Sequence, residues 1–382
     1  MVTKARVVAE IGLLLYPDCQ LAAIYGLTDL FRIANDIART ADAPSVQAIR
    51  VSHWRQEGED ITCIFDTHPG EEHSLTHVIM PPSLVVPEQM QKMTVFADWM
   101  TGLHQTGTTL CSVCAGAFVL AETGLLKGRE ATTHWAFADT LASRFPTVQV
   151  DADRMLIDDG DIITAGGILA WTDLGLTLVE RLLGPSVMLN TSRFLLIDPP
   201  GRAQRPYGQF VPTLGHGDAE ILAIQHWMQA TGAKEISVAA LAARAGLEER
   251  TLLRRFKQAT GLRPTEYAQQ IRIAKAREAL ELTRKPVEQI AWQVGYGDSS
   301  AFRKVFQRVT GVAPAEYRRR FGVVSQLSRR LFDSGKHLAA EGADPSPPPR
   351  ARGSAAHECE QIGVDDVGVR RRHPVRKPLV SL

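Results

Sequence analysis

Cys114 stands in a sequence context that is typical of a reactive thiol held at the end of a β-strand. The β-rich run TTLCSV, residues 108–113, leads into it, and the small residues Ala115 and Gly116 begin a turn into an apolar helix. A thiol at a helix N-terminus is expected to have a lowered pKa, because the helix dipole favours the thiolate. His134, in the segment TTHW, is a candidate base for such a nucleophile, but no carboxylate that would orient the base is evident.

Other interpretations of this region stay open. Cys114 is alternatively a buried, unreactive side chain, which is a common state of free cysteine. Cys111 and Cys114 form a single C-x-x-C pair, and residues three apart on a strand point to opposite faces, so we expect neither a metal site nor a disulfide. His68, His73 and His77, in THPGEEHSLTH, are expected to be surface residues. The sequence therefore predicts no metal and no cofactor.

The elements that would position Cys114 alternate between strand and helix patterns through residues 1–198. Strands are expected at VVAEIGLLLY, AIRVSHW, THVIM, TTLCSV and DIITAGG. Helices are expected at LAAIYGLTDLFRIANDIA, at PEQMQKMTVFADWMTGLHQ, which opens with Pro87, and at ILAWTDLGLTLVERLLG, which ends at Gly184. This alternation predicts a flavodoxin-like α/β sandwich with a mostly parallel sheet covered by helices.

Parallel strands bring their carboxyl ends to one edge of the sheet, which is where ligands of open α/β sheets bind. Cys114 and His134 are expected there, together with residues at the ends of other strands. The predicted effector pocket consists of Tyr16, Pro82, Cys114, His134, Trp135 and Gly166. Trp171 is a further candidate for an aromatic wall, although ordinary helix packing suits it better.

The composition indicates an ordinary globular protein with more than one domain. The chain has 382 residues, of which 45% are apolar and 22% charged, and its formal net charge is +1. Residues 234–320 nevertheless hold 18 Lys or Arg against 9 Asp or Glu, which points to a polyanionic partner for this segment. Five cysteines, no signal-like segment after MVTKARVV and only short apolar runs favour a cytoplasmic protein without structural disulfides or a membrane span.

The basic segment contains an internal repeat. VAALAARAGLEERTLLRRFKQATGLRPTEY recurs as VEQIAWQVGYGDSSAFRKVFQRVTGVAPAEY, with Gly246 matching Gly295 and Phe256 matching Phe306. Each copy predicts a helix, a tight turn at the glycine and a second helix, which is the arrangement of a helix-turn-helix. The connecting helix TEYAQQIRIAKAREALEL would hold the two units about one turn of DNA, roughly 34 Å, apart.

The second helix of each unit is expected to present a polar, basic face to the major groove and the phosphates of double-stranded DNA. The predicted DNA-binding residues are Arg250, Thr251, Arg254 and Arg255 in the first copy, and Ser299, Ser300, Arg303, Lys304 and Gln307 in the second. A plain helical bundle with a charged surface is the alternative, and the duplication argues against it.

Segments rich in Pro and Gly divide the chain. We expect an α/β domain at 1–198, a linker at 199–218, an all-α domain of two helix-turn-helix units at 219–322, and a disordered tail at 323–382 that ends in the basic run VRRRHPVRKPLVSL.

Residues 219–321 resemble the AraC/XylS family of transcription regulators, through the motifs LAARAGLEERTLLRRFKQATGLRPTEY and IAWQVGYGDSSAFRKVFQRVTGVAPAEYRRRF. The resemblance implies binding to promoter DNA and recruitment of RNA polymerase, usually as an activator. It also implies that Arg250, Thr251 and Arg254, with Ser299, Ser300, Arg303 and Lys304, read bases, whereas Arg255 and Gln307 serve phosphates or the surface.

Residues 6–196 resemble the class I glutamine amidotransferase-like superfamily of the ThiJ/PfpI type, through VCAGAFVLAETGLLKGREATTHW and DIITAGGILAWTDLGLTLVERLLG. Fused to an AraC-type domain, this looks like a GlxA-type regulator. The resemblance implies an elbow cysteine at Cys114, its histidine at His134, and an acidic partner at a position that is Ala23 here. Ser112 and Ala115 also depart from the enzymes' pattern.

We therefore expect a homodimeric transcription regulator whose N-terminal domain binds a small effector or dimerises. A cysteine-dependent amidase, hydratase or peptidase with an accessory DNA-binding domain is the rival hypothesis, and a scaffold with a collapsed pocket is a third.

Overall fold

The structure, a computed structural model, describes residues 6–40, 47–234 and 236–323. The basic end of the predicted tail lies outside the described residues. No helix within these ranges has the length and apolar character that crossing a membrane requires.

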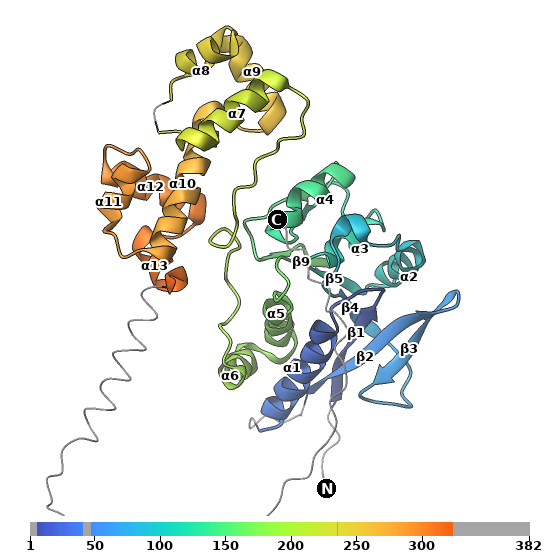
Figure 1. Cartoon of the computed structure of the whole chain (residues 1–382). Helices are drawn as coiled ribbons and strands as arrows, with labels where there is room; N and C mark the ends of the chain where they lie inside the picture. Colours follow the sequence, from blue (N-terminus) through green and yellow to red (C-terminus); the bar gives the residue numbers. More distant parts are fainter. Residues whose placement is uncertain (1–5, 41–46, 235, 324–382) are drawn as a thin grey trace, which may run out of the picture. The chain divides into compact units, whose positions relative to one another are not determined.

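A seven-stranded sheet forms the centre of the N-terminal part (Figure 1), with the strand order β3-β2-β1-β4-β5-β9-β8. Its five inner strands are parallel, and the edge strands β3 and β8 run antiparallel to their neighbours. The strands span Arg6–Leu15 (β1), Gln47–Glu57 (β2), Asp60–Asp66 (β3), Leu75–Met80 (β4), Thr109–Val113 (β5), Leu156–Asp158 (β8) and Ile162–Ala165 (β9). The predicted mostly parallel α/β fold is confirmed.

Helices cover the sheet and bury its apolar residues. Helices α1, α5 and α6 pack against one another, whereas α2 and α3 contact β5 (Figure 1). The helices span Leu21–Thr40 (α1), Thr94–Gln105 (α2), Gly116–Ala121 (α3), Ala138–Arg144 (α4), Trp171–Leu183 (α5) and Pro185–Leu195 (α6). Two short strands, Glu130–Ala131 (β6) and Gln149–Val150 (β7), pair beside this sheet.

One predicted helix is wrong in its start. The helix expected to open at Pro87 is only a single 3-10 turn at Pro87–Gln89, and α2 begins at Thr94. In contrast, α5 ends where predicted, because Gly184 adopts a φ of 90° that terminates the helix. Strands β3 and β8 and helix α6 were not predicted.

Among the described residues between Ala219 and Phe321, seven helices follow. They span Ala219–Thr231 (α7), Val238–Ala245 (α8), Glu249–Thr260 (α9), Pro264–Leu282 (α10), Val287–Gln293 (α11), Ser299–Thr310 (α12) and Pro314–Phe321 (α13). The repeat builds two separate apolar cores that meet along α10, with Ile271 in the first core and Ile273 in the second. Each core buries the matched phenylalanine, Phe256 or Phe306, so the predicted pair of helix-turn-helix units is confirmed.

Candidate functional sites: the Cys114 elbow and two basic helices

Cys114 occupies a sharp turn between β5 and α3. Its φ of 54° is unusual for a residue other than glycine. The backbone N–H of Cys114 donates to the carbonyl of Ala165, 2.8 Å away, and its carbonyl accepts from the hydroxyl of Thr133 at 2.7 Å. A Cβ on Gly116 would lie 2.4 Å from the carbonyl oxygen of Met80, so only glycine fits there. The strand-turn-helix geometry expected from the sequence is present.

The expectation of a lowered thiol pKa is wrong. Only 2% of Cys114 is exposed, and burial raises the pKa of its thiol from 9.0 to about 12. The helix that follows has six residues, so its dipole is small, whereas the desolvation of a buried thiolate is costly. The thiol is therefore neutral near pH 7.

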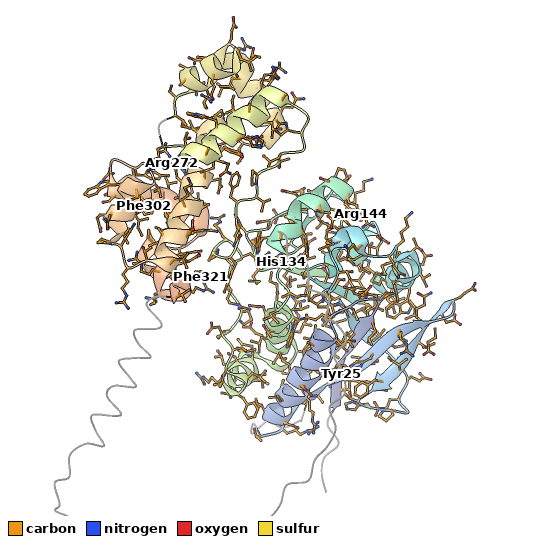
Figure 2. The ribbon with its side chains drawn as sticks, in the orientation of Figure 1. Tyr25, His134, Arg144, Arg272, Phe302 and Phe321 are labelled. Carbon is orange, nitrogen blue, oxygen red and sulfur yellow. The ribbon has the colours of Figure 1, made fainter. Side chains whose placement is uncertain are left out.

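The remaining members of an enzymatic site are arranged differently. His134 begins the turn Trp135–Phe137 (Figure 2), and its Nδ1 accepts a hydrogen bond from the N–H of Ala136 at 3.1 Å. Partial burial lowers the pKa of His134. Ala23, where the acidic partner was sought, is fully buried on α1. Among the described residues, no hydrogen bond links Cys114 to His134.

The residues of the predicted effector pocket differ in their exposure. Tyr16, Pro82, Cys114 and Gly166 are buried, whereas His134 and Trp135 are half-buried. The hydroxyl of Tyr16 donates to the carbonyl of Pro81 at 2.5 Å, and burial raises the pKa of Tyr16. The sequence analysis missed Gln204, which fills the space above Gly166. An isolated glutamine in a segment rich in Pro and Gly gives no local signal of such a contact.

Other residues named from the sequence have structural roles. Trp171 packs on Gly26 of α1, as ordinary helix packing predicts, since a Cβ on Gly26 would lie 2.5 Å from its ring. The prediction that His77 is a surface residue is wrong, because it is 6% exposed within β4. His73 contacts Glu10 at 2.6 Å. Within the described ranges, no group of three His, Cys, Asp or Glu side chains is placed to hold a metal ion.

Helices α9 and α12 each have a buried and a solvent-facing side. Leu252 and Phe256 of α9 and Phe302 and Phe306 of α12 are buried in matching positions. Of the predicted DNA-binding residues, Arg250, Arg254, Ser300, Arg303, Lys304 and Gln307 are exposed, and Thr251, Arg255 and Ser299 are half-buried. The two turns before these helices differ. Asp298 caps α12 through the N–H groups of Ser300 and Ala301, whereas Glu248 makes no side-chain cap on α9.

Two of the predicted DNA-binding arginines have acidic partners. Arg255 makes two hydrogen bonds to Asp218, at 2.7 and 2.8 Å, and one to Glu220 at 2.6 Å. These contacts raise the pKa of Arg255 and tie α9 to the start of α7. Arg303 pairs with Glu288, with about half of each side chain exposed. Exposed pairs are weak, so a phosphate or a base could replace Glu288 at little cost.

Comparisons with known proteins agree with both halves of this description. Residues 58–181 match the DJ-1/PfpI family, and residues 241–320 match a helix-turn-helix domain family. The chain is 26% identical over 337 residues to the HTH-type transcriptional regulator GlxA of Rhizobium meliloti (strain 1021), covering 84% of this chain and 98% of that relative.

Two further relatives are similar to different parts of the chain. The HTH-type transcriptional regulator CdhR of Pseudomonas aeruginosa is 28% identical over 222 residues, covering 58% of this chain and 66% of its own. An isonitrile hydratase of Pseudomonas putida is 29% identical over 180 residues, covering 46% of this chain and 72% of its own. The chain is thus a homologue of proteins named HTH-type transcriptional regulators, and in this chain a region that matches the DJ-1/PfpI family precedes one that matches a helix-turn-helix domain family.

Proposed function

We propose that this protein is a sequence-specific transcription regulator that binds promoter DNA through α9 and α12. The duplicated helix-turn-helix carries this proposal, since both second helices bury the same apolar side and expose a polar, basic one. Arg250, Arg254 and Lys304 are exposed and suit contacts with base edges or phosphates. Regulators named HTH-type among its relatives support the same function.

The two halves of the chain would have different roles in regulation. The N-terminal α/β part would bind a small effector at the carboxyl edge of its sheet and dimerise, and the dimer would place its reading helices on two half-sites. Activation through RNA polymerase is the mode that the AraC-type domain favours. Such a protein acts on DNA in the bacterial cytoplasm.

We further propose that the N-terminal part has no enzymatic role. A cysteine nucleophile needs a thiolate, a base and a group that orients the base. Here the thiol is buried and neutral, and Ala23 stands where the orienting acid was sought. The similarity to an isonitrile hydratase favours the rival hypothesis, an enzyme with an accessory DNA-binding domain, because the elbow itself is retained.

Selection of duplexes from a randomised DNA pool tests the regulator proposal directly. The full-length protein should enrich a defined sequence, and Arg254→Ala should weaken binding to that sequence by about 1–3 kcal/mol if Arg254 reads a base. Arg55→Ala is a matched control, because Arg55 is an exposed, ion-paired arginine on β2, outside the helix-turn-helix units. Enrichment of no sequence would overturn the proposal.

A further inference from the structure

Gln204, in the segment between the two halves of the chain, is held by several buried hydrogen bonds. Its side chain is 2% exposed. The two N–H groups of the amide face three acceptors, namely the Thr133 carbonyl at 2.8 Å, the Arg154 carbonyl at 3.0 Å and the Thr132 hydroxyl at 3.1 Å. The amide oxygen accepts from the N–H of Trp135 at 3.1 Å. Burial of a carboxamide costs free energy unless hydrogen bonds compensate for the lost contacts with water. The hydrogen bonds of Gln204 compensate for this cost and fix the position of the side chain.

The α/β part is shaped to receive this side chain. A Cβ on Gly166 would lie 1.9 Å from the Gln204 amide nitrogen, so the absence of a side chain there makes the space. The backbone of the segment is also paired, since the N–H of Gln204 donates to the Asp153 carbonyl at 2.9 Å and Ala203 forms a bridge with Arg154. Arg202 adds an ion pair with Asp173.

The partners of Gln204 adjoin the predicted effector pocket, and one of them, Trp135, belongs to it. Thr133, whose carbonyl binds the Gln204 amide, donates its hydroxyl to the carbonyl of Cys114. Trp135, whose N–H binds the Gln204 oxygen, follows His134 directly. Any movement of the turn at 132–135 would therefore break or strain the contacts that hold Gln204.

The residues just after Gln204 are held by the helix that joins the two helix-turn-helix units. Arg277 of α10 is 9% exposed, and its guanidinium donates to the carbonyls of Arg205, at 3.2 Å, and Gly208. Buried polar side chains thus hold this segment at two places, at Gln204 itself and at the carbonyls of Arg205 and Gly208. These contacts give residues 202–208 a defined course.

We propose that Gln204 acts as a latch, which is closed when its side chain is bound at the turn 132–135 and open when it has left that site. Through this latch the conformation of the turn beside Cys114 controls DNA binding. The proposal rests on the proposed regulatory function. When the turn at 132–135 changes shape, Gln204 leaves its site and the segment at 202–208 loses its fixed course. If DNA binding favours one course of this segment, opening the latch changes the affinity for DNA, and, because coupling between two sites is reciprocal, DNA binding in turn shifts the latch.

Two substitutions should open the latch, one by changing the Gln204 side chain and the other by changing the site that holds it. Gln204→Ala removes the carboxamide, and Gly166→Ala leaves Gln204 intact but places a methyl group where its amide nitrogen lies. Gln149→Ala and Gly102→Ala are the matched controls, because Gln149 makes an exposed bond to the Gly128 carbonyl and a Cβ on Gly102 meets nothing within 4 Å. Thermal unfolding followed by circular dichroism establishes that each variant is folded.

The assay is the Kd for a duplex that the wild-type protein selects from a randomised pool. Both latch variants should change this Kd in the same direction, by about five-fold or more, and the double variant should match the single ones. Trypsin should also cleave after Arg202 faster in both variants than in the controls. If the wild-type protein selects DNA but all six proteins share one Kd, the latch is overturned while the regulatory function stands. If the wild-type protein selects no DNA, both are overturned.

Discussion

The reactivity of Cys114 gives the sharpest test of whether the elbow is enzymatic. With a pKa of about 12 in the folded chain against 9.0 for an ordinary cysteine, the thiolate population near pH 8 falls about 1000-fold. Alkylation by iodoacetamide should therefore be slower by about that factor in the native protein than in the protein unfolded in guanidinium. Burial of the sulfur slows it further, because the reagent must reach a side chain that is 2% exposed.

Peptide mapping by mass spectrometry after timed alkylation measures this rate at each cysteine. Cys63 is an internal control, since it is only half-buried on β3 and should react well before Cys114. Raising the pH should speed the native reaction of Cys114 without a plateau up to about pH 12. A native rate at pH 8 that equals or exceeds the unfolded rate would show an activated thiol, and would refute the reasoning that sets catalysis aside.

The same shift predicts how pH affects stability. The folded chain holds the Cys114 proton more tightly than the unfolded chain does, so this contribution to the free energy of unfolding is complete below pH 9 and is lost between pH 9 and about 12. Urea unfolding across that range should show a smaller pH-dependent loss for Cys114→Ala than for the wild type. Asp298→Ala should destabilise the protein by about 0.5–2 kcal/mol in the same assay, whereas Glu248→Ala should cost little, because only Asp298 caps its helix. Phe306→Ala should cost about 3–5 kcal/mol, because it opens a cavity in the second helical core. Gly116→Ala should lower the thermal midpoint or prevent folding, since a Cβ there would lie 2.4 Å from a backbone oxygen that cannot move aside.

Much of the fold could be predicted because local patterns of apolar residues determine most of its strands and helices. The run VVAEIGLLLY is apolar enough for a strand buried on both faces, and β1 is an inner strand of the sheet, between β2 and β4. Strand β3 escaped prediction because it is an edge strand whose residues are mostly half-buried or exposed, so it lacks a strong apolar signal. The helix expected from Pro87 failed for a related reason, since four of residues 88–92 are polar and the segment has no apolar periodicity that would require a helix.

The predicted sites show where local patterns stop being informative. The turn at Cys114 follows from its small neighbours, but the pKa of the thiol depends on burial by side chains from elsewhere in the chain. Gln204 lies 50 to 72 residues from its four hydrogen-bond partners, and nothing beside it in the sequence indicates them. Arg255 was predicted from its place on a basic helix, yet Asp218, 37 residues earlier, supplies its main contact.

If the proposed function holds, the turn at Cys114 has kept its geometry while serving a purpose other than catalysis. In an enzyme the strained turn exists to present a side chain to a substrate. In this chain the side chain of Cys114 is buried, whereas its backbone carbonyl binds Thr133, which in turn binds Gln204. Such a backbone contact depends on the turn, Gly116 and Thr133, and it needs no acidic side chain at Ala23. On this reasoning Cys114→Ser, which keeps the backbone and the size of the side chain, should leave DNA binding unchanged, whereas Thr133→Val should alter the Kd for the selected duplex in the same direction as Gln204→Ala. If the Kd for the selected duplex changes in the serine variant and not in the valine variant, the function of the turn depends on the Cys114 thiol instead.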